Sequence, residues 1–176
     1  MSGREGLERL AGLLREQGGL IADAVSEPPA APPPSPAAIA AAGPRAGGDP
    51  REYELLVEAI YEGYLLHHGS TRLLAAADPD LGVLAGDHLY ALGLARLVEL
   101  GDVEAVTELA DVISLAALAH AAGDPELADA VWMAGANAVG WGSSETHERA
   151  KAMARDGAAG ALDAMLTSAG ERARST

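Results

Sequence analysis

Residues 79–122 read PDLGVLAGDHLYALGLARLVELGDVEAVTELADVISLAALAHAA, two long apolar segments on either side of Gly101-Asp102. Residues 79–100 predict one helix about 30 Å long at a rise of 1.5 Å per residue. Gly101-Asp102 is typical of a helix end followed by a new N-cap, so residues 103–122 are expected to return antiparallel. On that second helix Glu104, Glu108 and Asp111 predict a solvent-exposed side opposite the apolar stripe.

Three Asp-Pro pairs indicate where helices begin. Each joins an N-cap aspartate to a proline that fits the first helical position. The pairs are Asp49-Pro50, Asp78-Pro79 and Asp124-Pro125. They predict helices over 50–68, 79–100 and about 125–139, and a last helix is expected to run to about residue 169. The domain 49–176 is therefore predicted to be an all-α antiparallel helical bundle.

The N-terminal part differs in composition from this domain. Leucines recur near helical spacing over residues 1–26, which predicts an amphipathic helix interrupted at Gly18-Gly19. Residues 27–48 are rich in Pro, Ala and Gly, a composition typical of extended linkers. We therefore expect a helix that is tethered to the main domain by a mobile segment.

Charge and composition exclude several classes of function. The net charge of −14 opposes binding to a nucleic acid backbone or an anionic membrane. The absence of cysteine excludes disulfides and thiolate zinc sites. Neither a signal-peptide pattern nor an uncharged apolar segment of about 18 residues is evident, so no transmembrane segment and a cytoplasmic location are expected.

Few residues of the predicted bundle suggest chemistry. Asp87 shares a helix face with apolar residues, which predicts either a buried structural carboxylate or a ligand contact. His68, His88 and Tyr64 are likewise candidates for structural or ligand contacts. The glutamates at 54, 58 and 62 repeat every four residues; a solvated face explains them better than a magnesium site between helices. No metal-ligand pattern or catalytic set is recognisable, so no catalytic, cofactor-binding or metal-binding residue is assigned.

Three segments match a known pattern: LLHHG at 65–69, LAGDHLYA at 84–91 and LGD at 100–102. Together they resemble the first half of the trans-prenyl diphosphate synthase family, over roughly residues 53–122. The resemblance implies the terpenoid synthase-like helical fold for this part. In the family, paired aspartates after the first motif bind magnesium, which grips a diphosphate. Here the corresponding positions are His68, Gly69 and Arg72, none of which can take that role.

The resemblance therefore implies a subunit without activity of its own. The chain is similar to the small noncatalytic subunits of two-component polyprenyl diphosphate synthases in isoprenoid biosynthesis. Magnesium is expected only on a catalytic partner. Helices 79–100 and 103–122 would present an apolar face to that partner or to a second copy. The alternatives are an unrelated α-helical interaction or regulatory module, and a degenerate enzyme that still binds an isoprenoid.

Overall fold

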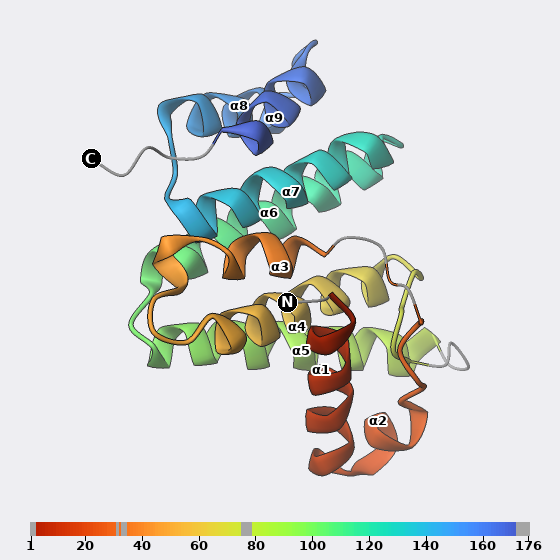
Figure 1. The fold of residues 1–176 in the computed structure, drawn as a ribbon. Helices are drawn as coiled ribbons and strands as arrows, with labels where there is room; N and C mark the ends of the chain where they lie inside the picture. The colour runs from red at the N-terminus through yellow and green to blue at the C-terminus, as the bar shows by residue number, and fades with distance from the viewer. Residues whose placement is uncertain (1–2, 31, 33–34, 75–78, 172–176) are drawn as a thin grey trace.

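The computed structural model describes residues 3–30, 32, 35–74 and 79–171, and these residues form an all-helical fold (Figure 1). Their one β pairing is an isolated antiparallel bridge between Val25 and Leu74. The all-α prediction is confirmed. In chain order the elements are α1 (Gly3–Gln17), α2 (Gly19–Ala24), α3 (Pro36–Ala41), the 3₁₀ turn η1 (Pro44–Ala46), α4 (Pro50–His67), α5 (Pro79–Glu99), α6 (Val103–Ala121), α7 (Pro125–Trp141), α8 (Glu145–Arg155) and α9 (Ala161–Gly170).

Side-chain caps begin the main helices as their sequences predict. The Asp49 carboxylate accepts a hydrogen bond from the backbone N–H of Glu52 at 3.0 Å. Asp102 and Asp124 cap α6 and α7 in the same way. Asp78 lies outside the described residues, although α5 does begin at the next residue. The final predicted helix is in fact two, α8 and α9, because the glycine-containing turn between them separates two short helical segments.

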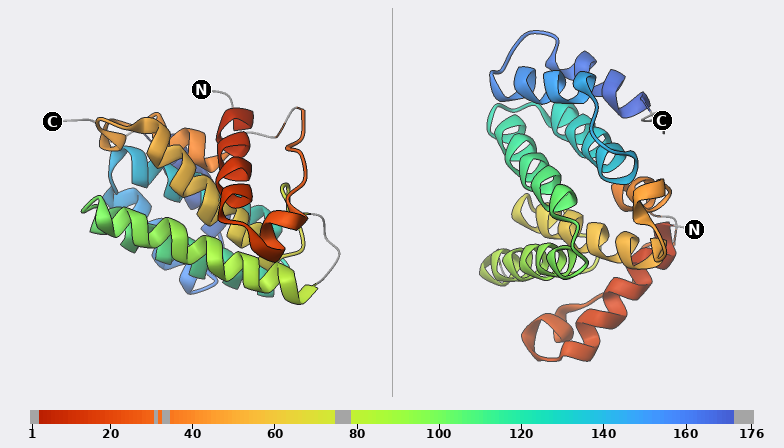
Figure 2. Two further views of the ribbon diagram at one scale, coloured as in Figure 1. Left: turned by 90° about the horizontal axis from the view of Figure 1, so that it is seen from below. Right: turned by 90° about the vertical axis from the view of Figure 1, so that its left-hand side faces the viewer.

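The helices form stacked layers, with α8 and α9 covering α6 and α7 on one side (Figure 1). On the other side lie α4 and α5, and α3 packs against both α4 and α7. Figure 2 shows α1 and α2 beyond α4 and α5, away from α6 and α7. The larger apolar cluster includes Trp132 and lies mainly among α3, α4, α6 and α7. A smaller cluster joins α1 to α4 and α5.

Glycines bring α4 and α5 into close contact. A Cβ atom at Gly86 would lie 2.8 Å from His67 Nε2 and 3.1 Å from the backbone oxygen of Gly63. At Gly93 it would lie 2.4 Å from the Ile60 side chain. Larger residues at these two positions would force the helices apart. The glycine of the LAGD segment thus has a packing role in this fold.

The prediction that residues 27–48 form an extended linker was wrong for its second half. Pro36 begins α3, and the Ser35 hydroxyl accepts a hydrogen bond from the Ala37 backbone N–H. The alanines of α3 are small enough for backbones to meet: a Cβ atom at Gly140 of α7 would lie 2.6 Å from the Ala40 oxygen. Low side-chain volume here permits tight packing. Residues 31, 33 and 34 of the predicted linker lie outside the described residues.

The predicted N-terminal amphipathic helix (1–26) is also more closely integrated than expected. It divides into α1 and α2 at Gly18, consistent with the predicted interruption. Leu7, Leu10 and Leu14 of α1 are at most 1% exposed and belong to the smaller apolar cluster. These leucines form an apolar stripe on α1 that is buried against α4. The helix is therefore docked on the main domain rather than loosely tethered to it.

Candidate functional site

Two of the predicted site residues lie together where α4 ends. Tyr64 is buried, and its ring lies 4.6 Å from that of His68. The His68 ring stacks on His120 of α6 with centroids 4.1 Å apart. Trp132 of α7 belongs to the same group, 5.1 Å from Tyr64. Side chains from three helices therefore form one aromatic cluster, which we define as Tyr64, His68, His120 and Trp132.

Tyr64 and His68 both favour their uncharged forms in this aromatic cluster. Burial raises the pKa of Tyr64, which keeps the phenol protonated. Burial, followed by the nearby His120 and His67, lowers the pKa of His68. The buried Tyr64 hydroxyl and Trp132 Nε1 form no hydrogen bond of normal geometry within the described residues. Tyr64, Trp132 and the uncharged form of His68 offer apolar and weakly polar contacts, without the positive charge that a diphosphate would require.

The other two predicted site residues lie elsewhere, on the exposed side of α5. The Asp87 side chain is 67% exposed, and its carboxylate lies 3.2 Å from His67 Nε2. The prediction that Asp87 is a buried structural carboxylate was wrong, because α5 turns Ala85, Gly86 and Leu89 inward instead. His88 is exposed and its Nε2 lies 2.8 Å from Gln17 Oε1. The four predicted residues do not form one site, and a ligand contact at Asp87 stays a prediction.

Buried charges on α4 were missed from sequence. Glu54, Glu58 and Glu62 are 1%, 0% and 0% exposed, so the expectation of a solvated glutamate face was wrong. The cause is that α4 is covered on several sides: α1, α3 and α5 all pack against it. The sequence signal for this burial was that most of the remaining residues of α4 are apolar, which is typical of a central helix.

Arg72 neutralises two of these carboxylates. Its Nη2 lies 2.5 Å from Glu58 Oε1 and its Nε 2.9 Å from Glu62 Oε2. Glu62 also accepts hydrogen bonds from the Thr71 hydroxyl and from backbone N–H groups of residues 72 and 73. The Ser35 hydroxyl donates to Glu58 at 2.5 Å. We define Ser35, Glu58, Glu62 and Arg72 as the Arg72 cluster. It fastens α4 to the segment that precedes α3 and to the segment that follows α4.

Glu54 lies one turn away and is unpaired. Neither of its buried carboxylate oxygens has a hydrogen-bond partner among the described residues. Burial, and then the negative charge of Glu58, raise the pKa of Glu54. An isolated buried carboxylate is costly when ionised and favours its protonated form.

A second buried ionic group joins α6 to α8 and α9. His147 Nε2 and Lys151 Nζ lie 2.7 Å and 2.9 Å from the two oxygens of Glu108. Lys151 also pairs with Asp111 at 2.9 Å, and His147 Nδ1 lies 2.7 Å from the Ser168 hydroxyl. We define these five residues as the Lys151 cluster. Glu108 is 7% exposed, so its predicted place on a solvated side was wrong, whereas Glu104 is exposed as predicted.

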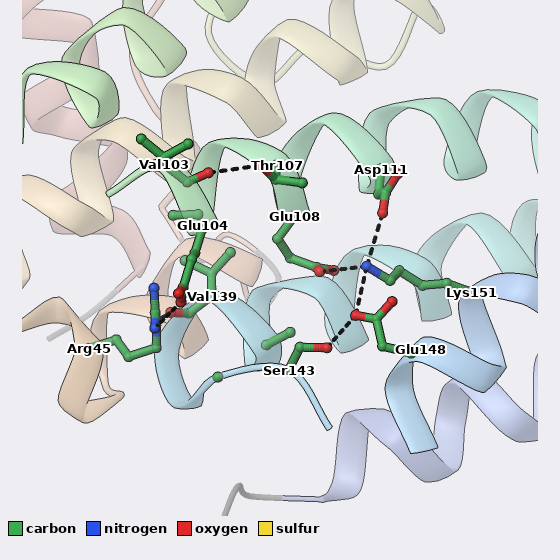
Figure 3. A pocket seen from close by; sticks show the side chains of 13 residues that line it. Arg45, Val103, Glu104, Thr107, Glu108, Asp111, Val139, Ser143, Glu148 and Lys151 are labelled. Atoms are coloured by element: carbon green, nitrogen blue, oxygen red, sulfur yellow. Dashed lines mark hydrogen bonds and ion pairs between the residues drawn. The ribbon is translucent and has the colours of Figure 1, made fainter. Parts of the chain in front are cut away.

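The serine, histidine and glutamate of the Lys151 cluster are linked in the order of a catalytic triad, but Ser168 is only 2% exposed. A nucleophile must reach its substrate, and this hydroxyl is enclosed. A cavity of about 380 Å³ adjoins Glu108 and Lys151 (Figure 3), and Ser168 does not line it. Its charged lining residues are two cations, Arg45 and Lys151, and four carboxylates. That balance opposes binding of a phosphate or diphosphate.

Five of the eight exposed large apolar side chains among the described residues lie on α5 and the turn into α6. Val83 and Leu84 near the start of α5 are 48% and 64% exposed. Val98, Leu100 and Val103 at the other end are 54%, 53% and 61% exposed. Together they place exposed apolar side chains at both ends of α5, and exposed apolar groups are a feature of interaction surfaces. We define these five residues as the α5 surface.

A metal site and a membrane span are two further possibilities. Within the ranges that the structure describes, no group of three or more His, Asp or Glu side chains is placed to hold a metal ion. One helix in the same ranges, Pro79–Glu99, is long and apolar enough to cross a membrane, with a mean hydropathy of 1.3 over 18 residues. A single helix of this kind is weak evidence for a membrane span, because ordinary helices of globular proteins also meet these criteria.

Comparison with protein-family models, with curated proteins and with solved structures found no match to this chain. No relative therefore bears on the all-helical fold, the two buried ionic clusters or the α5 surface.

Proposed function

We propose that this protein is a noncatalytic accessory subunit of a heteromeric polyprenyl diphosphate synthase, and that the α5 surface binds the catalytic subunit. The observation that carries this proposal is the exposure of large apolar side chains along α5, a helix that is itself apolar. Leu84 and Val98 lie about 21 Å apart along the helix at 1.5 Å per residue. Contacts over that span suit an interface of ordinary size.

The charged groups support a noncatalytic role. In the resemblance to prenyl synthases, His68, Gly69 and Arg72 occupy the positions of the metal-binding aspartates. His68 stacks in the aromatic cluster, and Arg72 pairs with Glu58 and Glu62. His68 and Arg72 therefore hold the fold together. The magnesium chemistry is assigned to the catalytic partner. The pair would assemble in the cytoplasm.

Co-purification tests the binding step. The chain is co-expressed with a full-length prenyl synthase from the same organism that carries both Asp-rich motifs, and the complex is measured by size-exclusion chromatography. Val98→Arg should abolish the complex, because a charge would be buried at the interface. Leu166→Arg is the matched control: Leu166 has the same 54% exposure but lies on α9.

A complex that resists Val98→Arg, or that Leu166→Arg disrupts equally, would contradict the assignment of the α5 surface. Failure to bind any such synthase, together with specific binding of an unrelated protein through α5, would instead favour the interaction-module alternative.

A further inference from the structure

We propose that α1 is a releasable cover whose docking on α4 is favoured by a proton on Glu54, so that the cover loosens as the pH rises. This device is independent of the α5 surface and of the proposed partner. It rests on the unpaired Glu54 carboxylate beneath α1, which the rest of the fold does not compensate.

The carboxyl group of Glu54 is enclosed beneath α1. Glu54 is 1% exposed and neither oxygen has a hydrogen-bond partner within the described residues. A Cβ atom at Gly6 of α1 would lie 3.2 Å from Glu54 Cδ, so α1 lies directly over this carboxyl group. Removal of α1 would expose the carboxyl group to water. Docking of α1 is therefore coupled to the hydration of Glu54.

Charged side chains on α1 and α4 surround Glu54. Glu58 on the same helix and Glu5 on α1 disfavour an ionised Glu54, whereas Arg9 on α1 favours it. Arg9 donates a hydrogen bond to the Arg51 backbone oxygen at 2.5 Å, and α3 carries no ionisable side chain. Burial is the largest influence, and the pKa of Glu54 is raised. The docked state therefore favours the protonated carboxyl.

Apolar packing of α1 opposes its release. The α1 leucines at positions 7, 10 and 14 are fully buried against the smaller apolar cluster, which favours docking at any pH. Because the carboxyl pKa is higher with α1 docked than released, docking is strongest when Glu54 is protonated. It weakens as the pH rises through the raised value, and above that value no further change is expected.

Hydrogen exchange on the full chain tests the proposal. Protection factors of α1 amides are measured between about pH 5 and about pH 8, with the intrinsic exchange rate at each pH divided out. The opening equilibrium of α1 should rise by up to about tenfold per pH unit within the linked range. Amides of α7 serve as the internal reference and should stay more strongly protected than those of α1 at every pH.

Glu54→Gln removes the charge with almost no change of shape, and the α1 profile should then be flat. Glu52→Gln is the control on the same helix; Glu52 pairs with Arg96 at 3.2 Å on the α5 side, and its variant should keep the parent's pH dependence. A flat profile in the parent would overturn the proposal, even if Glu54→Gln fails to fold. So would an unchanged pH dependence in a folded Glu54→Gln protein.

Discussion

In the Arg72 cluster, one cation faces two fully buried carboxylates. In the Lys151 cluster, by contrast, a lysine and a histidine share Glu108, and the second carboxylate, Asp111, is part-exposed. Carboxylates cluster on one helix in both cases, yet their environments differ. The Lys151 cluster lies beside a cavity open to solvent, and the Arg72 cluster does not border the cavities described. Charge removal should therefore be costlier around Arg72.

The largest expected effect is that of Arg72→Met. It leaves Glu58 and Glu62 buried without an opposing charge, which should lower the free energy of unfolding by about 3–5 kcal/mol. Urea denaturation followed by circular dichroism measures the loss. Arg155→Met is the control, because Arg155 is 53% exposed and meets Asp111 only at 3.5 Å. A loss of less than about 1 kcal/mol for Arg72→Met would mean that water reaches the carboxylates.

Lys151→Met should have a smaller effect of about 2–3 kcal/mol, since His147 still pairs with Glu108 and Asp111 is part-exposed. The same urea denaturation gives the value. The carboxylates raise the pKa of Lys151 against the opposing effect of burial, so the lysine is charged at neutral pH. A loss larger than that of Arg72→Met would reverse the comparison between the two clusters.

The aromatic cluster provides a pH-dependent contrast to both. Burial, and then His120, lower the pKa of His68 from its ordinary value of 6.5. Because the pKa of His68 is lower in the folded state, the fold keeps its full stability at pH values above the ordinary pKa. That stability is lost as the pH falls through the lowered pKa. Acidification from about pH 7.5 to about pH 5.5 should cost less than about 1 kcal/mol through His68. His68→Gln, compared with the parent at each pH, should lack this loss; equal losses would contradict it.

The smallest expected effect is that of Asp87→Ala, because the carboxylate is mostly exposed and its one ion pair is with a histidine. The free energy of unfolding should change by no more than about 0.5 kcal/mol. Equilibrium unfolding in urea decides this case. A loss above about 1 kcal/mol would place Asp87 with the buried charges after all.

The helices of the main domain were predictable because their start signals are local. Asp49 and Asp124 cap helices through backbone groups three residues away, so a short segment contains the whole interaction. Burial of Glu58 was not predictable in this way. Its partners Ser35 and Arg72 lie 23 residues before it and 14 after it, outside α4.

The same limit explains α3. Its alanines suggested a linker by composition, and only the approach of Gly140 from α7 shows that small residues were needed there. Asp87 was misplaced for a related reason: the side of an apolar helix that faces the core depends on its neighbours, and α5 is apolar on most sides. Long-range packing therefore determined which candidate residues are buried.

Prenyl transfer by the reconstituted pair tests the central claim most directly. The isolated chain, the catalytic subunit and their complex are each given magnesium with allylic and isopentenyl diphosphates, and product chain lengths are compared. We predict no turnover by the isolated chain and a product distribution from the complex that differs from that of the catalytic subunit alone. Steady magnesium-dependent product formation by the isolated chain, or an identical product distribution with and without it, would contradict the assignment as a noncatalytic accessory subunit.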